Sequence, residues 1–124
     1  MEKPKILLVD DSQTMILFEK LVLGGGYEII TAENGQKGLE AVIEERPDLV
    51  LLDLMMPVMD GMAALKAIRV TNEGQNIPII MVTTKSEEER VEACYKLGCT
   101  DYITKPIKQV ELILKVRKYL AGAG

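Results

Sequence analysis

Five short apolar runs alternate along the chain with longer segments in which apolar residues recur every three or four positions. Runs of aliphatic residues four or five long are typical of strands buried in a parallel sheet, and the wider spacing is typical of amphipathic helices. Strict alternation predicts right-handed crossovers and a doubly wound α/β fold, with five parallel strands and helices on both faces. The expected strands are Lys5–Val9, Tyr27–Thr31, Asp48–Leu52, Ile79–Thr83 and Thr100–Thr104.

Caps and chain breakers bound the first two expected helices. Ser12 is a candidate N-cap for a helix that continues to Leu23, where the glycines at 24–26 end it. Asn34 is the candidate cap of a second helix that runs to about Arg46. The face of the first helix that packs on the core is expected to include Met15, Phe18, Leu21 and Val22.

The later helices are expected over Met62–Val70, over the segment that follows Ser86, and over Lys108–Leu120. Ser86 and Glu89 have the spacing of a capping box, which predicts where the fourth helix begins. The segment at 121–124 is expected to be a frayed tail or the stub of a linker.

Length and composition bound the class of protein. The 124 residues, 48% of them apolar, suit a single domain over residues 1–124. Fifteen basic against nineteen acidic residues give a net charge of −4, which argues against direct binding to nucleic acid. Cys94 and Cys99 are too few for a disulfide scaffold and are interpreted as small buried hydrophobes.

No apolar run approaches the ~20 residues of a membrane span. The residues at 1–4 run straight into the first expected strand without the pattern of a signal peptide. A cytoplasmic location without membrane contact is therefore the default expectation.

Three acidic positions follow two of the apolar runs. Asp10 and Asp11 come directly after the run at 6–9, and Asp53 comes directly after the run at 49–52. The carboxyl ends of parallel strands meet at one edge of a sheet, so these carboxylates converge if the two strands are neighbours. Like charges that close repel, and a bound divalent cation that prefers oxygen ligands, such as Mg²⁺, resolves the repulsion.

Thr83 ends the fourth expected strand and Lys105 follows the fifth, so both side chains should reach the same edge. The predicted site then combines three carboxylates, one hydroxyl and one ammonium. This set suits phosphoryl transfer to a carboxylate, because Mg²⁺ and the ammonium neutralise phosphoryl oxygens and the hydroxyl donates a hydrogen bond.

Four segments carry these residues at a specific spacing. They read ILLVDDS at 6–12, DLMMPVMDG at 53–61, IIMVT at 79–83 and DYITKP at 101–106. With these motifs the chain resembles the receiver domain of bacterial two-component response regulators, the chemotaxis-type phospho-acceptor fold, over nearly its whole length. The resemblance implies the flavodoxin-like strand order 2-1-3-4-5.

The resemblance also implies a role for each acidic residue. Asp53 would be the phospho-acceptor. Asp10 and Asp11 would hold Mg²⁺ together with Asp53, Asp11 directly and Asp10 through water, and Met55 would lend its backbone carbonyl to the metal. Many relatives carry a polar side chain where Met55 stands, so the lifetime of the phosphorylated state stays open.

The other motif residues would form the switch. Lys105 would contact the phosphoryl group, and the bond between Lys105 and Pro106 would be cis. Thr83 and Tyr102 would be the switch pair, whose hydroxyl moves toward the phosphate while the ring turns inward. The surface that changes would comprise the fourth helix, the fifth strand and the fifth helix.

Partners follow from the same resemblance. The chain contains no histidine, so a phosphohistidine must come from a sensor histidine kinase or a phosphotransfer protein. A downstream effector protein would bind the face that changes, and homodimerisation through that face stays open. The chain would be a signalling phospho-acceptor that assists its own phosphotransfer and dephosphorylation, not an enzyme in the usual sense.

Three alternatives are weighed against this interpretation. A phosphatase of the haloacid dehalogenase type would place a second aspartate where Met55 stands. A nucleotide- or flavin-binding module would need a glycine-rich loop after the first strand, where Asp10, Asp11 and Ser12 stand. A receiver-like module that binds partners without phosphorylation would be favoured by loss of a site residue, and all are present.

Overall fold

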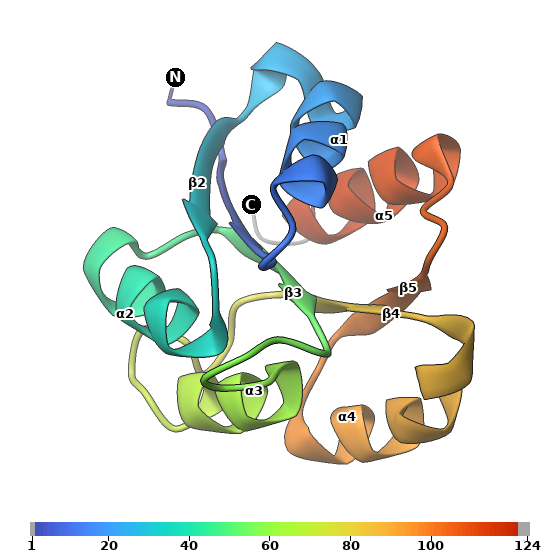
Figure 1. The fold of residues 1–124 in the computed structure, drawn as a ribbon. Coiled ribbons are helices and arrows are strands. Elements are labelled where there is room, and N and C mark those ends of the chain that lie inside the picture. The colour runs from blue at the N-terminus through green and yellow to red at the C-terminus, as the bar shows by residue number, and fades with distance from the viewer. Residues whose placement is uncertain (1, 122–124) are drawn as a thin grey trace.

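A computed structural model describes residues 2–121, in which the five strands form one sheet (Figure 1). Every neighbouring pair is parallel and the order is β2-β1-β3-β4-β5, which confirms the predicted doubly wound, flavodoxin-like arrangement. The strands are β1 (Lys5–Val9), β2 (Glu28–Ala32), β3 (Leu49–Asp53), β4 (Ile79–Thr83) and β5 (Asp101–Thr104).

Helices cover both faces of the sheet, as predicted. α1 and α5 lie on one face, and α2, α3 and α4 lie on the other (Figure 1). Among residues 2–121, no helix is both long enough and apolar enough to cross a bilayer. The helices are α1 (Gln13–Leu23), α2 (Gly35–Glu45), α3 (Gly61–Arg69), α4 (Val91–Leu97) and α5 (Gln109–Ala121), with the 3₁₀ helices η1 (Gly24–Gly26) and η2 (Lys85–Arg90).

Two apolar cores lie on opposite sides of the sheet, and neighbouring residues of one strand belong to different cores. In β1, Leu7 and Val9 pack in the core under α2, α3 and α4, whereas Ile6 and Leu8 pack in the core under α1 and α5. This is the period of two expected for a strand buried on both faces. Cys94 and Cys99 are free and buried, as small apolar residues would be.

The predicted capping residues are confirmed for two helices and wrong for a third. Ser12 and Asn34 accept backbone N–H groups of α1 and α2, as predicted. The expected box of Ser86 and Glu89 is wrong. The carboxylate of Glu87 instead accepts the N–H of Thr84 at 2.7 Å, because the chain leaves β4 in an extended conformation at Thr84 and turns immediately into η2.

The predicted inner face of α1 and some element boundaries also need correction. Met15, Phe18 and Val22 pack against the core as predicted. Leu21 is 73% exposed, whereas Glu19 is only 1% exposed, because the helix turns the stripe of Ile16, Glu19 and Leu23 toward the core. Several expected element boundaries shift by one residue, and α4 begins at Val91 because η2 occupies the segment that follows Ser86. The boundary that matters is in β3, which includes Asp53. Ala121 ends α5 and does not belong to a tail, and the rest of the expected tail, 122–124, lies outside the described residues.

Gly61 shapes the turn that follows β3. Its N–H donates to the carbonyl of Leu54 at 2.7 Å, and a Cβ at this position would lie 2.3 Å from the carbonyl oxygen of Asp53. The start of α3 therefore packs directly against the backbone of the strand end, which positions Asp53.

We expect Gly61→Ala to lower the free energy of unfolding by about 1–3 kcal/mol, because the added methyl group meets backbone that cannot move aside. Gly25→Ala is the matched control, since no atom lies within 4 Å of a Cβ there. Its effect should stay within about 0.5 kcal/mol. Urea unfolding measures both, and equal effects at the two positions would contradict the assigned role of Gly61.

Candidate functional site

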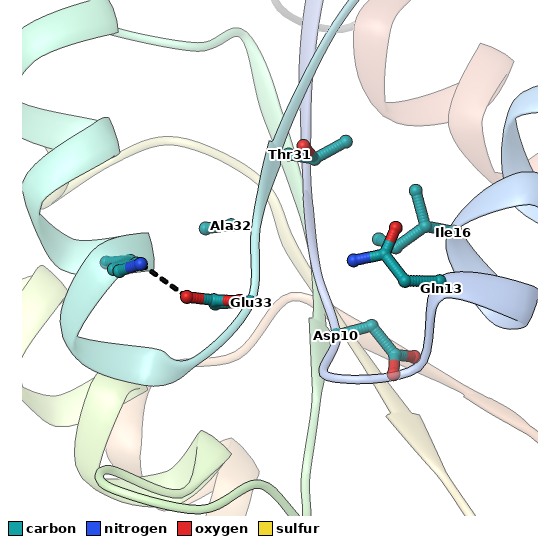
Figure 2. A pocket seen from close by; sticks show the side chains of 7 residues that line it. Asp10, Gln13, Ile16, Thr31, Ala32 and Glu33 are labelled. Carbon is teal, nitrogen blue, oxygen red and sulfur yellow. Dashed lines mark hydrogen bonds and ion pairs between the residues drawn. The ribbon is translucent and has the colours of Figure 1, made fainter.

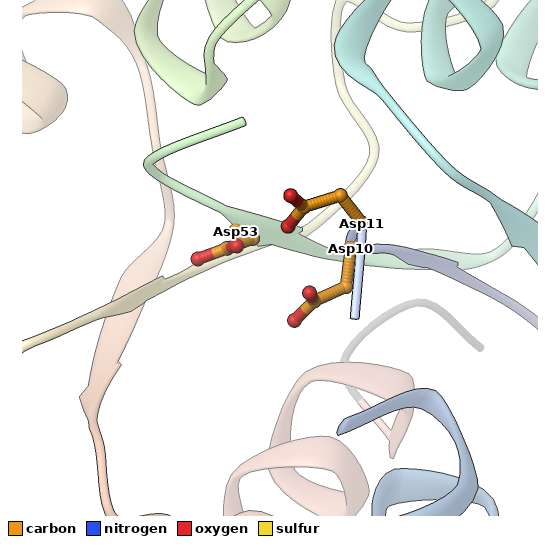
Figure 3. A group of neighbouring side chains, drawn as sticks. All are labelled: Asp10, Asp11 and Asp53. Atoms are coloured by element: carbon orange, nitrogen blue, oxygen red, sulfur yellow. The ribbon is translucent and has the colours of Figure 1, made fainter. Parts of the chain in front are cut away.

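Asp10, Asp11 and Asp53 meet at the carboxyl ends of β1 and β3 (Figure 3). The two strands are neighbours in the sheet, with Val9 opposite Leu52, so the residues that follow them reach the same level. One carboxylate oxygen from each of the three residues lies within 4.8 Å of the others. The convergence predicted from the sequence is therefore present in the fold.

Burial makes this cluster electrostatically unfavourable on its own. Asp10 is 2% exposed and Asp53 is 4% exposed, whereas Asp11 is exposed to solvent. Burial, followed by the charge of Asp10, raises the pKa of Asp53 to about 6, although Lys105 opposes the shift. Burial also raises the pKa of Asp10, partly offset by the N–H of Ser12 that its Oδ1 accepts at 2.9 Å.

Lys105 is the cation of the site. Its Nζ lies 3.2 Å from Oδ1 of Asp53 and 4.0 Å from Oδ2 of Asp10, and the bond between Lys105 and Pro106 is cis. Burial by itself lowers the pKa of Lys105, but the charges of Asp53 and Asp10 outweigh burial and raise it. Among the described residues, Lys105 is the cation that pairs with Asp10 and Asp53, so most of the negative charge of the three carboxylates is left unbalanced.

Within the described chain, two buried side-chain oxygens have no hydrogen-bond partner: Oδ2 of Asp10 and Oγ1 of Thr83. Buried polar atoms are nearly always paired, so two unpaired oxygens at one edge of the sheet point to a group supplied from outside. Hard carboxylate oxygens with excess negative charge fit a divalent cation such as Mg²⁺. The free hydroxyl of Thr83 fits an oxyanion.

The structure places Tyr102 on the face of the sheet covered by α4 and Met55 in the loop after β3. Tyr102 is opposite Met81 in the sheet and Thr104 is opposite Thr83, so the side chains of Tyr102 and Thr83 lie on the face covered by α4. Met55 lies in the loop after β3, where its side chain is 49% exposed and its sulphur accepts a hydrogen bond from Arg90, which precedes α4, at 3.3 Å.

A cavity of about 300 Å³ adjoins the acidic cluster on the side of β2 (Figure 2). Its lining includes Asp10, Gln13 and Thr31, and the ion pair of Glu33 with Lys37 lies at its edge. The buried carboxylate of Asp10 therefore borders a polar space large enough for several water molecules.

Comparison with known proteins decides the family. Residues 6–117 match the response regulator receiver domain. The chain belongs to this family. The receiver domain is 36% identical to the protein PilH of Pseudomonas aeruginosa over 119 residues, which cover 95% of this chain and 98% of PilH.

Solved receiver structures have the same fold. The chemotaxis protein CheY4 of Vibrio cholerae superposes with a TM-score of 0.87 at 30% identity, covering 94% of this chain and 98% of that one. The receiver domain of the sensor histidine kinase PA1611 from Pseudomonas aeruginosa, with a magnesium ion in its active site cleft, gives a TM-score of 0.84 at 31% identity and covers 96% of this chain and 98% of its own.

Family membership fixes the general function. Receiver domains are phospho-accepting signalling domains of two-component systems and not classical enzymes. They bind Mg²⁺ at an acidic pocket and interact with histidine kinases and effectors. Family membership therefore argues against the two alternatives of a haloacid dehalogenase-type phosphatase and a nucleotide- or flavin-binding module.

Glu19 is a buried acid that sequence reasoning missed. Burial raises its pKa to about 8, with a further contribution from the charge of Asp10 and opposition from Lys105. The residue therefore holds its proton at neutral pH and adds no charge to the acidic cluster. Its helical spacing from Ile16 and Leu23 could have indicated that Glu19 faces the core. A glutamate is nearly always exposed, however, so the residue type alone predicts a position in solvent.

We expect Glu19→Gln to flatten the pH dependence of stability. The folded wild type keeps this proton up to about pH 8, whereas the unfolded chain loses it near the ordinary value of 4.5, so the free energy of unfolding falls as pH rises through this window. The variant should lose roughly 1–3 kcal/mol less stability across the window than the wild type. Urea unfolding at pH 5 and pH 8 measures the difference, and parallel losses in both proteins would contradict the assignment.

Proposed function

We propose that the chain is a phosphorylation-dependent switch in which Asp53 accepts a phosphoryl group from a partner histidine kinase or phosphotransfer protein. The observation that carries this proposal is the convergence of three carboxylates and one ammonium at one edge of the sheet. Asp53 is the carboxylate in contact with Lys105 at 3.2 Å, and it ends a buried strand that fixes its position.

In the proposed transfer, a carboxylate oxygen of Asp53 forms a bond to phosphorus while the bond between phosphorus and the histidine nitrogen of the partner breaks. The electron pair of the broken bond stays on the imidazole, which takes up a proton. Lys105 neutralises charge on the phosphoryl oxygens, and the unpaired hydroxyl of Thr83 donates to one of them.

Mg²⁺ would supply further neutralisation of the phosphoryl oxygens when bound. Asp11 and Asp53 would hold it directly, Met55 would contribute its backbone carbonyl, and Asp10 would act through water. The polar cavity beside Asp10 supports a water-mediated role, and the exposed position of Asp11 suits direct ligation. The magnesium ion in the structurally similar PA1611 receiver supports the choice of metal.

The proposed output runs through Thr83 and Tyr102. Movement of the Thr83 hydroxyl toward a phosphoryl group would free space on the face covered by α4, where Tyr102 is only partly buried. The resulting change at α4, β5 and α5 would favour one population of an effector-binding surface. An effector protein that prefers this population would sense phosphorylation.

We expect the wild type, incubated with Mg²⁺ and acetyl phosphate, to gain one phosphoryl group that is labile to base. Asp53→Asn should gain none, because the nucleophilic oxygen is replaced by an amide. Intact-protein mass spectrometry measures the adduct. Asp48→Asn is the matched control, since Asp48 precedes the other end of β3 and accepts the backbone N–H of Lys5.

Two results would oppose the proposal in different ways. Stoichiometric labelling of Asp53→Asn at another residue would reject Asp53 as the acceptor. A wild type that binds Mg²⁺ but takes up no phosphoryl group from acetyl phosphate or from any phosphohistidine donor would favour the alternative of a phosphorylation-independent interaction module.

We also expect the wild type to bind one Mg²⁺ at millimolar or lower concentration and Asp11→Asn to bind it about tenfold or more weakly, because a charged ligand becomes neutral. Asp11 is exposed, so its substitution leaves the core unchanged. Isothermal titration calorimetry measures both affinities, with Asp48→Asn as the control. Equal affinities in the wild type and Asp11→Asn would remove Asp11 from the ligand set.

A further inference from the structure

Asp101 accepts hydrogen bonds from all three elements of the face that contains Tyr102. The hydroxyl of Tyr119 in α5 donates at 2.6 Å and the ammonium of Lys115, also in α5, donates at 3.1 Å. The N–H of Tyr102 in β5 donates at 2.7 Å, and the hydroxyl of Tyr95 in α4 lies at 3.5 Å. One carboxylate thus ties α4, β5 and α5 together at a single point.

The groups bound to Asp101 also enclose Tyr102. The Nζ of Lys115 donates to the carbonyl of Tyr102 at 2.7 Å and lies 5.6 Å from the centre of its ring, within the range of a cation–π contact. The ring of Tyr95 meets the ring of Tyr102 edge to face, with centroids 6.4 Å apart. Lys115 and Tyr95, which both contact the Tyr102 ring, are therefore held by the same carboxylate.

The charge on Asp101 is what makes these contacts strong. Burial by itself raises the pKa of Asp101, but the hydrogen bonds from Tyr119, Tyr102 and Lys115 outweigh burial and lower it, so the carboxylate is ionised at neutral pH. Hydrogen bonds to an ionised acceptor are roughly twice as strong as neutral ones. Replacing the carboxylate by an amide keeps its shape and removes this advantage.

We propose that Asp101 is a positioning residue that holds the Tyr102 side chain in its present orientation and so sets the resting population of the switch. The role in switching rests on the proposed function, whereas the restraint on Tyr102 does not. Loss of the charge would loosen Lys115 and Tyr95 together, and the ring between them would sample its second orientation without a phosphoryl group. The resting protein would then resemble the phosphorylated one more closely.

The test uses the full chain labelled with ¹³C at the ε carbons of its four tyrosines, with each signal assigned by a Tyr→Phe variant. The reference state is the wild type saturated with Mg²⁺ and beryllium trifluoride, a phosphoryl analogue. In Asp101→Asn without either ligand, the Tyr102 signal should move part of the way toward its reference position. Tyr119→Phe, which removes one donor to Asp101, should move it less, and Asp48→Asn should leave it unchanged.

The rate of phosphorylation is a second measurement, which should not change if Asp101 only connects α4, β5 and α5. If the resting population shifts, labelling of Asp53 by acetyl phosphate should accelerate about twofold or more in Asp101→Asn, because the apparent rate scales with the fraction of competent molecules. An unchanged Tyr102 signal in a cooperatively folded variant overturns the proposal. A signal that moves away from the reference position, with an unchanged labelling rate, also overturns it and leaves Asp101 as a local tie.

The outcomes separate this proposal from the proposed function. Failure of the wild type to be labelled at Asp53 rejects the phospho-acceptor role, but the Tyr102 signal in the unphosphorylated variants still reports whether Asp101 positions the ring. If Asp101→Asn does not fold, Tyr119→Phe carries the test, because it keeps the aromatic ring and removes only the hydroxyl that donates to Asp101.

Discussion

Repulsion among three carboxylates is the interaction around which the site is arranged. In β1, Ile6 and Leu8 point into the core under α1 and α5, and Asp10 is the next residue on the same side of the strand. In β3, Leu51 points into the same core and Asp53 is the next residue on that side. Apolar packing therefore forces two acids together at the strand ends with little solvent between them. Lys105 relieves part of the repulsion, and the excess negative charge that remains creates affinity for a cation.

The sheet also separates the charged residues of the site from the residues proposed to transmit phosphorylation. Asp10, Asp53 and Lys105 belong to the rows on the α1 and α5 face, whereas Thr83 belongs with Met81 to the opposite face. The N–H of Lys105 donates to the carbonyl of Thr83 at 2.6 Å, so one backbone bond joins the cation of the site to the residue with the unpaired hydroxyl. A group that contacts both side chains acts on both faces at once.

Much of the fold and the acidic cluster could be predicted because both depend on local signals. Apolar runs fix the strands, and strand ends of neighbouring parallel strands share an edge, so the positions of Asp10 and Asp53 follow. What failed depends on tertiary contacts. The rotation of α1 that buries Glu19 and exposes Leu21 is set by packing on the sheet and on α5, and the early cap at Thr84 is set by the end of β4. The hydrogen bonds to Asp101 join residues up to 18 positions apart, which no local pattern reveals.

The split of β1 between two cores has an evolutionary consequence. Insertion or deletion of a single residue within Lys5–Val9 would turn part of the strand over, so that Leu7 would face the core in which Leu8 now packs. The same change would move Asp10 away from the level of Asp53. Length changes in this segment are therefore eliminated by misfolding before they can alter signalling. Selection for a foldable protein thus keeps Asp10 at the level of Asp53, even during periods when phosphorylation itself is under no selective pressure.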